Sequence, residues 1–220
     1  MPFTGWPAAA FDFYAGLESD NSKAYWTAHR EIYDGSVKAP FDALGEQVRA
    51  EFGPLRIFRP YRDTRFAKDK SPYKTAAAAA TEGEGGTHYY VQVSAEGLYV
   101  GAGYYHLAPD QLERYRVAVA DTRSGAKLEA ALATLGRQKY DTTPADALKT
   151  APRGYPSDHP RIALLRRKGV HAGRAFGTPR WVSTKGALDR IVTVWRDTKP
   201  MNDWLDRYVG PSEEAPPEPD

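Results

Sequence analysis

The sequence predicts an α+β fold, with N-terminal helices, a central antiparallel sheet that contains a β-hairpin, and C-terminal helices. Three observations support this fold class. Apolar residues recur at helical spacing through the first fifty residues, alternate with polar residues over 88–105, and return to helical spacing after residue 109. Because helices and strands fall into separate blocks, the α+β class is favoured over alternating βαβ units.

The N-terminal block is predicted to hold several helices. One begins at a cap formed by Asn21 or Ser22 and stops at Gly35, and a second covers 40–52 and ends before Gly53. Serine and asparagine are favoured caps because their side chains accept a hydrogen bond from the first free backbone N–H groups. Glycine often follows a helix because it has no Cβ to clash there.

The central block is predicted to be extended. Residues 55–66 are rich in aromatic and β-branched side chains, and Pro60 within them indicates an edge strand or a break. The segment 88–105 gives the clearest strand pattern, with 95–97 as a short glycine-containing hairpin connection.

The C-terminal block returns to helices, with one further extended part. Turn-forming residues separate its periodic segments. The expected segments are a helix from Pro109, a helix capped by Ser124 and ended by Gly136, a loop over 141–160, a helix from Asp158 or His159, one or two strands over 169–183, and helices around 188–195 and 204–208.

Length and composition predict one domain over residues 1–209. The chain has 220 residues, of which 41% are hydrophobic, enough for a real core. The remaining residues, 210–220, are acidic and rich in proline, so we expect a disordered tail there. No apolar run reaches the roughly 18 residues that a membrane helix needs, and no secretory signal is recognised at the N-terminus.

The chain contains no cysteine. This excludes disulfides, thiolate metal sites and a cysteine nucleophile, and it favours a cytoplasmic location. The histidines are scattered without metal-ligand spacing, so no metal is expected. No phosphate loop or dinucleotide fingerprint is present, so no cofactor is expected either. Gly101 and Gly103, inside the second strand of the hairpin, are interpreted as permitting close packing.

Charge is unevenly distributed along the chain. The net charge is only +2, but residues 49–75 contain eight basic and three acidic residues, and residues 151–199 contain eleven and three. Two basic segments on an otherwise acidic chain give a polarised surface if they meet in space.

A dense group of basic residues follows the first predicted strand. Guanidinium groups suit carboxylates and phosphates because two parallel N–H donors match two oxygens. If this segment is extended, Arg62 and Arg65 lie on opposite faces and differ in burial, and one of them pairs with Asp63 or Asp69. The alternative is a solvated strand edge with ordinary ion pairs. The candidate anion-binding residues are Arg59, Arg62, Arg65, Lys70, Tyr73 and Lys74.

Two further segments supply secondary candidates. On a helix, Lys23, Trp26, Arg30 and Tyr33 form one cationic–aromatic stripe, with His29 beside it. The stripe can line a pocket, with His29 as acid, base or donor, or it can be half-buried packing covered by the cationic side chains. The stiff turn at 151–156 displays a second pair, Arg153 and Tyr155.

Four segments together resemble a known bacterial family: NSKAYWTAHREIY, RDTRFAKDKSPYKT, YYVQVSAEGLYVGAGYY and LKTAPRGYPSDHP. The family is catalogued as domain of unknown function 2461, and the similarity covers nearly the whole chain apart from the tail. No reaction or ligand is assigned to it. The resemblance implies that a signature runs through the basic group, in which Ala67 replaces a small polar residue. The signature residues are Arg62, Asp63, Arg65, Phe66, Asp69, Lys70 and Tyr73.

Three functions are compatible with these patterns. The first is binding of a small phosphorylated or carboxylated compound at the basic group, with or without catalysis. The second is a nucleic-acid-binding module, since basic residues are interleaved with aromatic ones, although the net charge is small and no nucleic-acid motif is present. The third is a non-catalytic scaffold that binds a partner protein. The patterns identify no reaction.

Overall fold

The computed structural model describes residues 2–65, 69–81 and 88–213. Five strands form one antiparallel sheet: β1 (Leu55–Ile57), β2 (Ala76–Thr81), β3 (His88–Ser94), β4 (Gly97–Tyr104) and β5 (Val170–Gly177). Their order in the sheet follows the chain, β1-β2-β3-β4-β5. The hairpin predicted over 88–105 is therefore confirmed as β3 and β4, with helices before and after the sheet as the α+β class requires.

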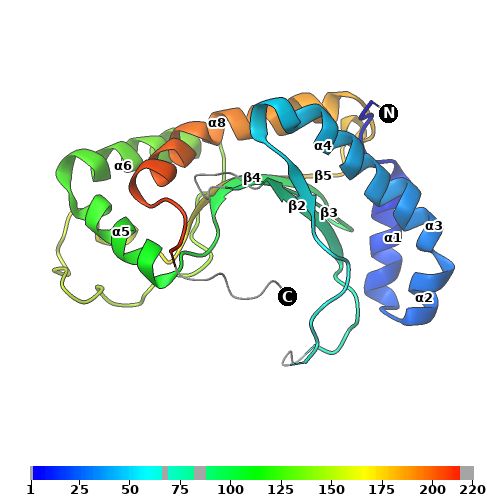
Figure 1. The fold of residues 1–220 in the computed structure, drawn as a ribbon, viewed down its shortest axis with the longest axis horizontal. Coiled ribbons are helices and arrows are strands. Elements are labelled where there is room, and N and C mark those ends of the chain that lie inside the picture. Colours follow the sequence, from blue (N-terminus) through cyan, green and yellow to red (C-terminus); the bar gives the residue numbers. More distant parts are fainter. Residues whose placement is uncertain (1, 66–68, 82–87, 214–220) are drawn as a thin grey trace.

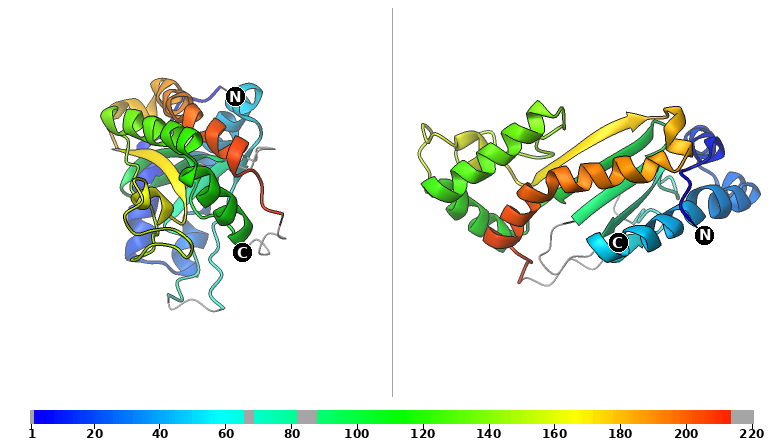
Figure 2. Two further views of the ribbon diagram at one scale, coloured as in Figure 1. Left: turned by 90° about the vertical axis from the view of Figure 1, so that its left-hand side faces the viewer. Right: turned by 90° about the horizontal axis from the view of Figure 1, so that it is seen from above.

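The helices form a layer on one side of the sheet. They are α1 (Ala8–Ser19), α2 (Lys23–Ala28), α3 (Arg30–Ile32), the π-helix η1 (Tyr33–Lys38), α4 (Ala39–Phe52), α5 (Pro109–Ala120), α6 (Thr122–Arg137), α7 (Ile162–Leu165), the 3-10 helix η2 (Arg180–Ser183) and α8 (Gly186–Tyr208). Helices α4 and α8 run over the convex face of the curved sheet, while α5 and α6 lie at one end of the molecule and α1–α3 at the other (Figure 1). The view from above shows α8 lying over the sheet, roughly along the direction of its strands (Figure 2). No helix of the described residues covers the concave face (Figure 1).

The core lies between the convex face and this helical layer. Val91, Val93 and Val100 point towards the helices and are fully buried, as are Phe41 and Trp195. Each large apolar side chain removed from water stabilises the fold by roughly 1.5–3 kcal/mol. The alternate residues of the same strands are left on the concave face.

The N-terminal helices differ from the prediction at one point. Ser22 caps α2, and its hydroxyl accepts from the N–H of Tyr25 at 3.1 Å, as predicted. Gly35 does not stop the helical segment, because the chain continues through η1 into α4. A side chain at Gly35 would face open space, so this glycine neither packs nor caps.

The first predicted strand, β1, is shorter than expected. Its neighbour in the sheet, β2, was not predicted. The prediction of an extended strand over 55–66 is wrong beyond Ile57, where β1 ends. The following residues form an arm (described residues 58–65 and 69–75), held by an isolated bridge between Tyr61 and Tyr73. The N–H of Arg62 donates to Pro72 at 2.9 Å, and that of Lys74 donates to Pro60 at 2.8 Å.

Three corrections concern the C-terminal helices. Asp121, not Ser124, caps α6, because its carboxylate accepts from the N–H of Ser124 at 2.8 Å. The two helices predicted around 188–195 and 204–208 are one, since α8 continues through Pro200. The helix predicted from Asp158 or His159 is reduced to the four residues of α7. The segment 169–183 contains β5 and then η2.

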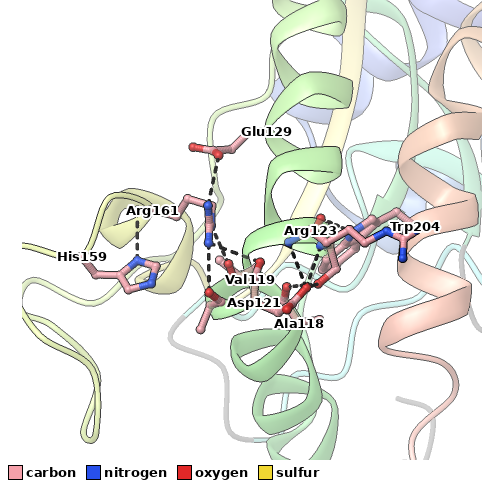
Figure 3. Close-up of polar contacts among 10 residues, drawn as sticks. Ala118, Val119, Asp121, Arg123, Glu129, His159, Arg161 and Trp204 are labelled. Carbon is pink, nitrogen blue, oxygen red and sulfur yellow. Dashed lines mark hydrogen bonds and ion pairs between the residues drawn. The ribbon is translucent and has the colours of Figure 1, made fainter.

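Arg161 joins the two C-terminal helices α5 and α6 to the loop before α7 (Figure 3). Its side chain is only 9% exposed. Nε donates to the carbonyl of Val119 at 2.7 Å, and Nη2 donates to Ala120 at 2.9 Å and to Asp121 at 3.2 Å. The carbonyls of Val119 and Ala120 lie in the last turn of α5 and lack helical partners, whereas that of Asp121 also accepts from the N–H of Gly125 at 2.9 Å. Arg161 therefore closes that helix end.

The start of the predicted tail contacts the domain. The hydroxyl of Tyr104 donates to the carbonyl of Gly210 at 2.9 Å, and Ser212 donates to Asp110 at 2.8 Å. Residues 214–220, for which we predicted disorder, lie outside the described residues. Within the described part of the chain, no helix is both long and apolar enough to cross a bilayer.

Candidate functional site

The arm's arginines are held by neighbouring carboxylates. Arg65 donates to Asp63 through Nε at 3.0 Å and through Nη2 at 2.6 Å, and Arg62 pairs with Asp69. The side chain of Arg62 is 29% exposed and that of Arg65 is 72% exposed. The predicted difference in burial is present, but both arginines pair with an aspartate, whereas we expected one pair.

Other groups of the arm also bind one another. Lys70 donates to the carbonyl of Thr64 at 2.8 Å. Two hydrogen bonds from Ser71 hold the pKa of the Asp69 carboxyl below its usual value, and Arg62 lowers it further. Arg59 is exposed and Lys74 is partly buried. The signature residue Phe66 and the departure at Ala67 lie outside the described residues.

Tyr73 fastens the arm to the N-terminal helices. Its ring is buried and stacks on Trp26, with ring centres 4.4 Å apart and planes 7° apart. The side chain of Asn21 donates to the carbonyl of Tyr73 at 3.0 Å and accepts from its N–H at 3.0 Å. Burial raises the pKa of the Tyr73 hydroxyl. The geometry thus gives Tyr73 a packing role.

The cationic–aromatic stripe of the N-terminal helices packs against the arm and the core. Trp26 and Tyr33 are buried, with ring centres 4.8 Å apart. Arg30 lies over the ring of Trp26 and donates to Asp34 at 2.9 Å, while Lys23 is exposed. These contacts agree with the packing interpretation of the stripe.

His29 belongs to the same helical region but makes only local contacts. Its ring stacks on Tyr25 with centres 4.0 Å apart, and Nδ1 donates to the carbonyl of Tyr25 at 2.8 Å. Arg153 and Tyr155 belong to the loop between α6 and α7, and α6 lies at the other end of the molecule from α1–α3 (Figure 1). The structure therefore does not bring these candidates together.

The two basic segments meet at an ion pair on the helical side. Arg196 of α8 donates to Glu51 of α4 through two bonds of 2.7 Å. Glu51 lies within the first basic segment, so an acidic residue stands at the junction.

A cleft occupies the concave face of the sheet. It encloses a volume of about 700 Å³ and is lined by residues of all five strands. Opposed residues of antiparallel strands point to the same side, so the lining residues form rows across the sheet. The middle row runs Arg56, Ala80, Tyr90, Gly101, Gly173. Only Arg56 and Tyr90 in this row have large side chains, so its small residues leave room above them for neighbouring groups.

The two flanking rows carry the polar and aromatic groups. One row is His88, Gly103 and His171, and the other contains Gln92, Tyr99 and Ala175. Tyr99 leans over the glycines of the middle row: a Cβ on Gly173 would lie 2.1 Å from its hydroxyl oxygen. Gly173 therefore leaves room for the ring of Tyr99, which lines the cleft.

Burial keeps the hydroxyls of Tyr90 and Tyr99 in the cleft protonated at neutral pH. Burial raises the pKa of Tyr90 to about 12, and its hydroxyl donates to Gln92 at 2.6 Å. Burial also raises the pKa of Tyr99, with a further contribution from Asp141. Tyr105, at the end of β4, adds a third, exposed hydroxyl. The cleft thus combines neutral hydroxyl groups with a cation, Arg56, at its β1 edge.

Each histidine of the cleft has a distinct environment. Nδ1 of His88 donates to the carbonyl of Thr81 at 2.7 Å. Nδ1 of His171 is buried and has no hydrogen-bond partner among the described residues. Burial lowers the pKa of His171; Asp141 raises it, and Arg167 and His106 lower it. His171 is therefore a neutral imidazole at pH 7.

A family comparison agrees with the resemblance seen in the sequence. A family model described as conserved hypothetical protein (DUF2461) matches residues 9–204. The chain belongs to the DUF2461 family. The match spans the arm and every strand that lines the cleft, so both features lie within the family's region. No curated protein matches this DUF2461 chain. Over its described ranges, no group of three or more acidic or histidine side chains is placed to hold a metal ion.

The sequence did not identify the cleft of this DUF2461 protein. We had noted His88 and His171 only as scattered histidines and the tyrosines only as strand residues. One signal was present: alternation in the predicted hairpin puts His88, Tyr90 and Gln92 on one face. On a fully solvated sheet face, an aromatic residue such as Tyr90 opposite a glycine has no packing role, so this pattern could have indicated a site.

Proposed function

We propose that this protein binds a small organic compound in the concave cleft, and that the compound has a flat body and a carboxylate or phosphate group. The observation that carries the proposal is the middle row of the sheet. Its residues Ala80, Gly101 and Gly173 have small side chains or none, the ring of Tyr99 lies over the two glycines, and Tyr90 and Tyr99 both line the cleft. A concave site with an apolar lining and a few convergent polar groups is typical of ligand pockets.

The flat body is proposed from the position of Tyr99. Its ring lies against Gly101 and Gly173, with its hydroxyl oxygen within 3.1 Å of where a Cβ on Gly101 would be. A planar ligand can stack on the other side of this ring. The hydroxyl of Tyr90 donates its one proton to Gln92 at 2.6 Å, so its oxygen can accept a hydrogen bond from a donor group of the same ligand.

The acidic group is proposed from the charges around the cleft. Among the described residues that line it, Arg56 is a cation, Glu96 is a carboxylate, and His88 and His171 add two imidazoles. The same chemistry was expected of the arm, where Arg62 and Arg65 have aspartate partners. An acidic ligand group bound in the cleft has no need to displace those ion pairs.

A cleft-filling substitution tests the proposal. We expect phenyl phosphate and benzoate to raise the melting temperature of the wild-type protein by mass action, and Ala80→Trp to abolish the rise. The indole would occupy the middle row beside Tyr90. The measurement is thermal unfolding against ligand concentration, with sodium chloride at matched ionic strength.

Ala133→Trp is the matched control, because Ala133 is exposed on α6, outside the cleft. It should respond to both compounds like the wild type. A response of Ala80→Trp equal to that of the wild type would place binding outside the cleft and remove the proposed function.

A further inference from the structure

We propose that the flat body of the ligand is a nucleobase. An N–H group of the base and the acceptor atom beside it bind Tyr90 and Gln92, and the hydroxyl of Tyr99 binds another polar atom of the base. This inference rests on the proposed function and adds to it the chemical class of the flat body. All three side chains line the cleft and are partly buried. Gln92 is opposite Tyr99 in the register of β3 and β4, and Tyr90 is two residues from Gln92 on the same strand.

Tyr90 and Gln92 together can accept one hydrogen bond and donate another. The hydroxyl of Tyr90 donates its one proton to Oε1 of Gln92 at 2.6 Å, so its oxygen is left as an acceptor. Nε2 of Gln92 carries two N–H donors and has no hydrogen-bond partner among the described residues. Because Nε2 belongs to the same amide as Oε1, the donor and the acceptor lie side by side.

This pattern is complementary to the edge of a nucleobase. The bases carry N–H donors beside carbonyl or ring-nitrogen acceptors, and proteins recognise them by hydrogen bonds to these edges. A plain phenyl ring has neither group, so it would cover the Tyr90 oxygen and the Gln92 amide without giving them partners. A polar group that loses water and gains no partner weakens binding. The pair therefore favours a nitrogen heterocycle over a hydrocarbon ring.

The hydroxyl of Tyr99 adds a third polar group to this part of the cleft. Its oxygen is 2.1 Å from where a Cβ on Gly173 would be and 3.1 Å from where one on Gly101 would be. Gly101 is opposite Tyr90, and the ring centres of Tyr90 and Tyr99 are 6.1 Å apart. Within the described part of the chain, the Tyr99 hydroxyl has no hydrogen-bond partner. A hydroxyl can donate or accept, so it can bind either kind of atom on the same base.

The probes for this site are the four ribonucleoside monophosphates, phenyl phosphate and ribose 5-phosphate. Phenyl phosphate lacks the polar ring atoms, and ribose 5-phosphate lacks the ring. We expect at least one nucleotide to bind the wild type about tenfold more tightly than either comparison compound. The double variant Tyr90→Phe/Gln92→Met should weaken binding of that nucleotide about thirtyfold, and Tyr99→Phe about fivefold. Binding of phenyl phosphate should change less than about twofold in both variants, because they keep the size of the side chains. Calorimetric titration at constant ionic strength measures the dissociation constants.

Tyr61→Phe is the matched control, because Tyr61 is an exposed tyrosine of the arm, outside the cleft. It should bind every probe like the wild type. The double variant can lose its fold, which thermal unfolding would show, and Tyr99→Phe then decides alone.

The inference is overturned if no nucleotide binds more tightly than phenyl phosphate and ribose 5-phosphate. It is also overturned if the variants weaken phenyl phosphate as much as the nucleotide, or if Ala80→Trp binds the nucleotide like the wild type. If phenyl phosphate still binds the wild type and Ala80→Trp still blocks it, only the nucleobase is rejected and the proposed function stands. Loss of both responses would remove the proposed function as well.

Discussion

Replacing Arg161 by alanine is expected to lower the free energy of unfolding by about 3 kcal/mol, because buried carbonyls at the end of α5 would lose a charged donor. The guanidinium contacts the carbonyls of Val119, Ala120 and Asp121 at 2.7–3.2 Å. It also lies 3.8 Å from Glu129 of α6. Urea unfolding followed by circular dichroism gives the free energy.

The geometry explains why no other residue can replace this arginine. Its planar fork reaches three carbonyls at once, whereas the ammonium of lysine is a single point. Arg161→Lys should therefore recover only part of the loss. A Cβ on Gly125 would lie 2.4 Å from Nε of Arg161, so the side chain passes closely over the first turn of α6. The contact holds α5 and α6 at a fixed distance.

Arg123→Ala is the control for Arg161→Ala. Arg123 is exposed in the same region and carries the same charge (Figure 3). Exposed substitutions of this kind change stability by about 0.5 kcal/mol or less. Equal losses in the two variants would mean that charge, not the buried hydrogen bonds, determines the effect.

The central sheet was only partly predictable, because its strands differ in side-chain chemistry. The hairpin of β3 and β4 was recognised because it is rich in aromatic and β-branched residues and because apolar and polar residues alternate along it. Strand β2 consists almost wholly of alanine, which has low strand propensity, so it gave no signal. Its small side chains are nevertheless what opens the floor of the cleft at Ala80.

Long-range contacts explain the helical corrections. The helix α8 continues through Pro200, although proline within a helix costs about 3 kcal/mol. Fully buried side chains on both sides of that residue, including Trp195, Met201 and Leu205, hold the two halves against the sheet and the other helices. Local propensity cannot show such packing, and the sequence therefore predicted two helices.

The candidate site was misplaced for a related reason. Basic residues of the arm are close in sequence and so were recognised, but their aspartate partners are equally close. The cleft is made by register instead: His171 joins His88 only because both are opposite Gly103. No local pattern encodes this juxtaposition. The interpretation that Gly101 and Gly103 permit close packing is confirmed, since a Cβ would lie 3.0 Å from the carbonyl oxygen of Ala172 at Gly101 and 2.3 Å from that of Val170 at Gly103; both glycines also line the cleft.

Replacing Trp26 by alanine should lower the free energy of unfolding by about 4 kcal/mol, the usual loss for a buried tryptophan. The indole is buried and stacks on Tyr73 at 4.4 Å, and Phe13 and Tyr33 also contact it. Its Nε1 has no hydrogen-bond partner among the described residues, so packing supplies the whole effect. Chemical unfolding is the measurement, and Lys23→Ala on the exposed part of the stripe is the control.

The same variant tests what Trp26 does for the arm. Stacking on Tyr73 holds the arm beside α2, so its loss should speed hydrogen exchange at the N–H groups of Arg62 and Lys74, which bridge the two sides of the arm. The amides of the β3–β4 hairpin are the internal control. At matched global stability their protection from exchange should be the same in the variant and the wild type. If Trp26 instead lined a ligand site, alanine would weaken binding of phenyl phosphate while leaving arm exchange and stability unchanged. That result would restore the pocket-wall interpretation of the stripe, because a packing residue cannot be removed without cost to the fold.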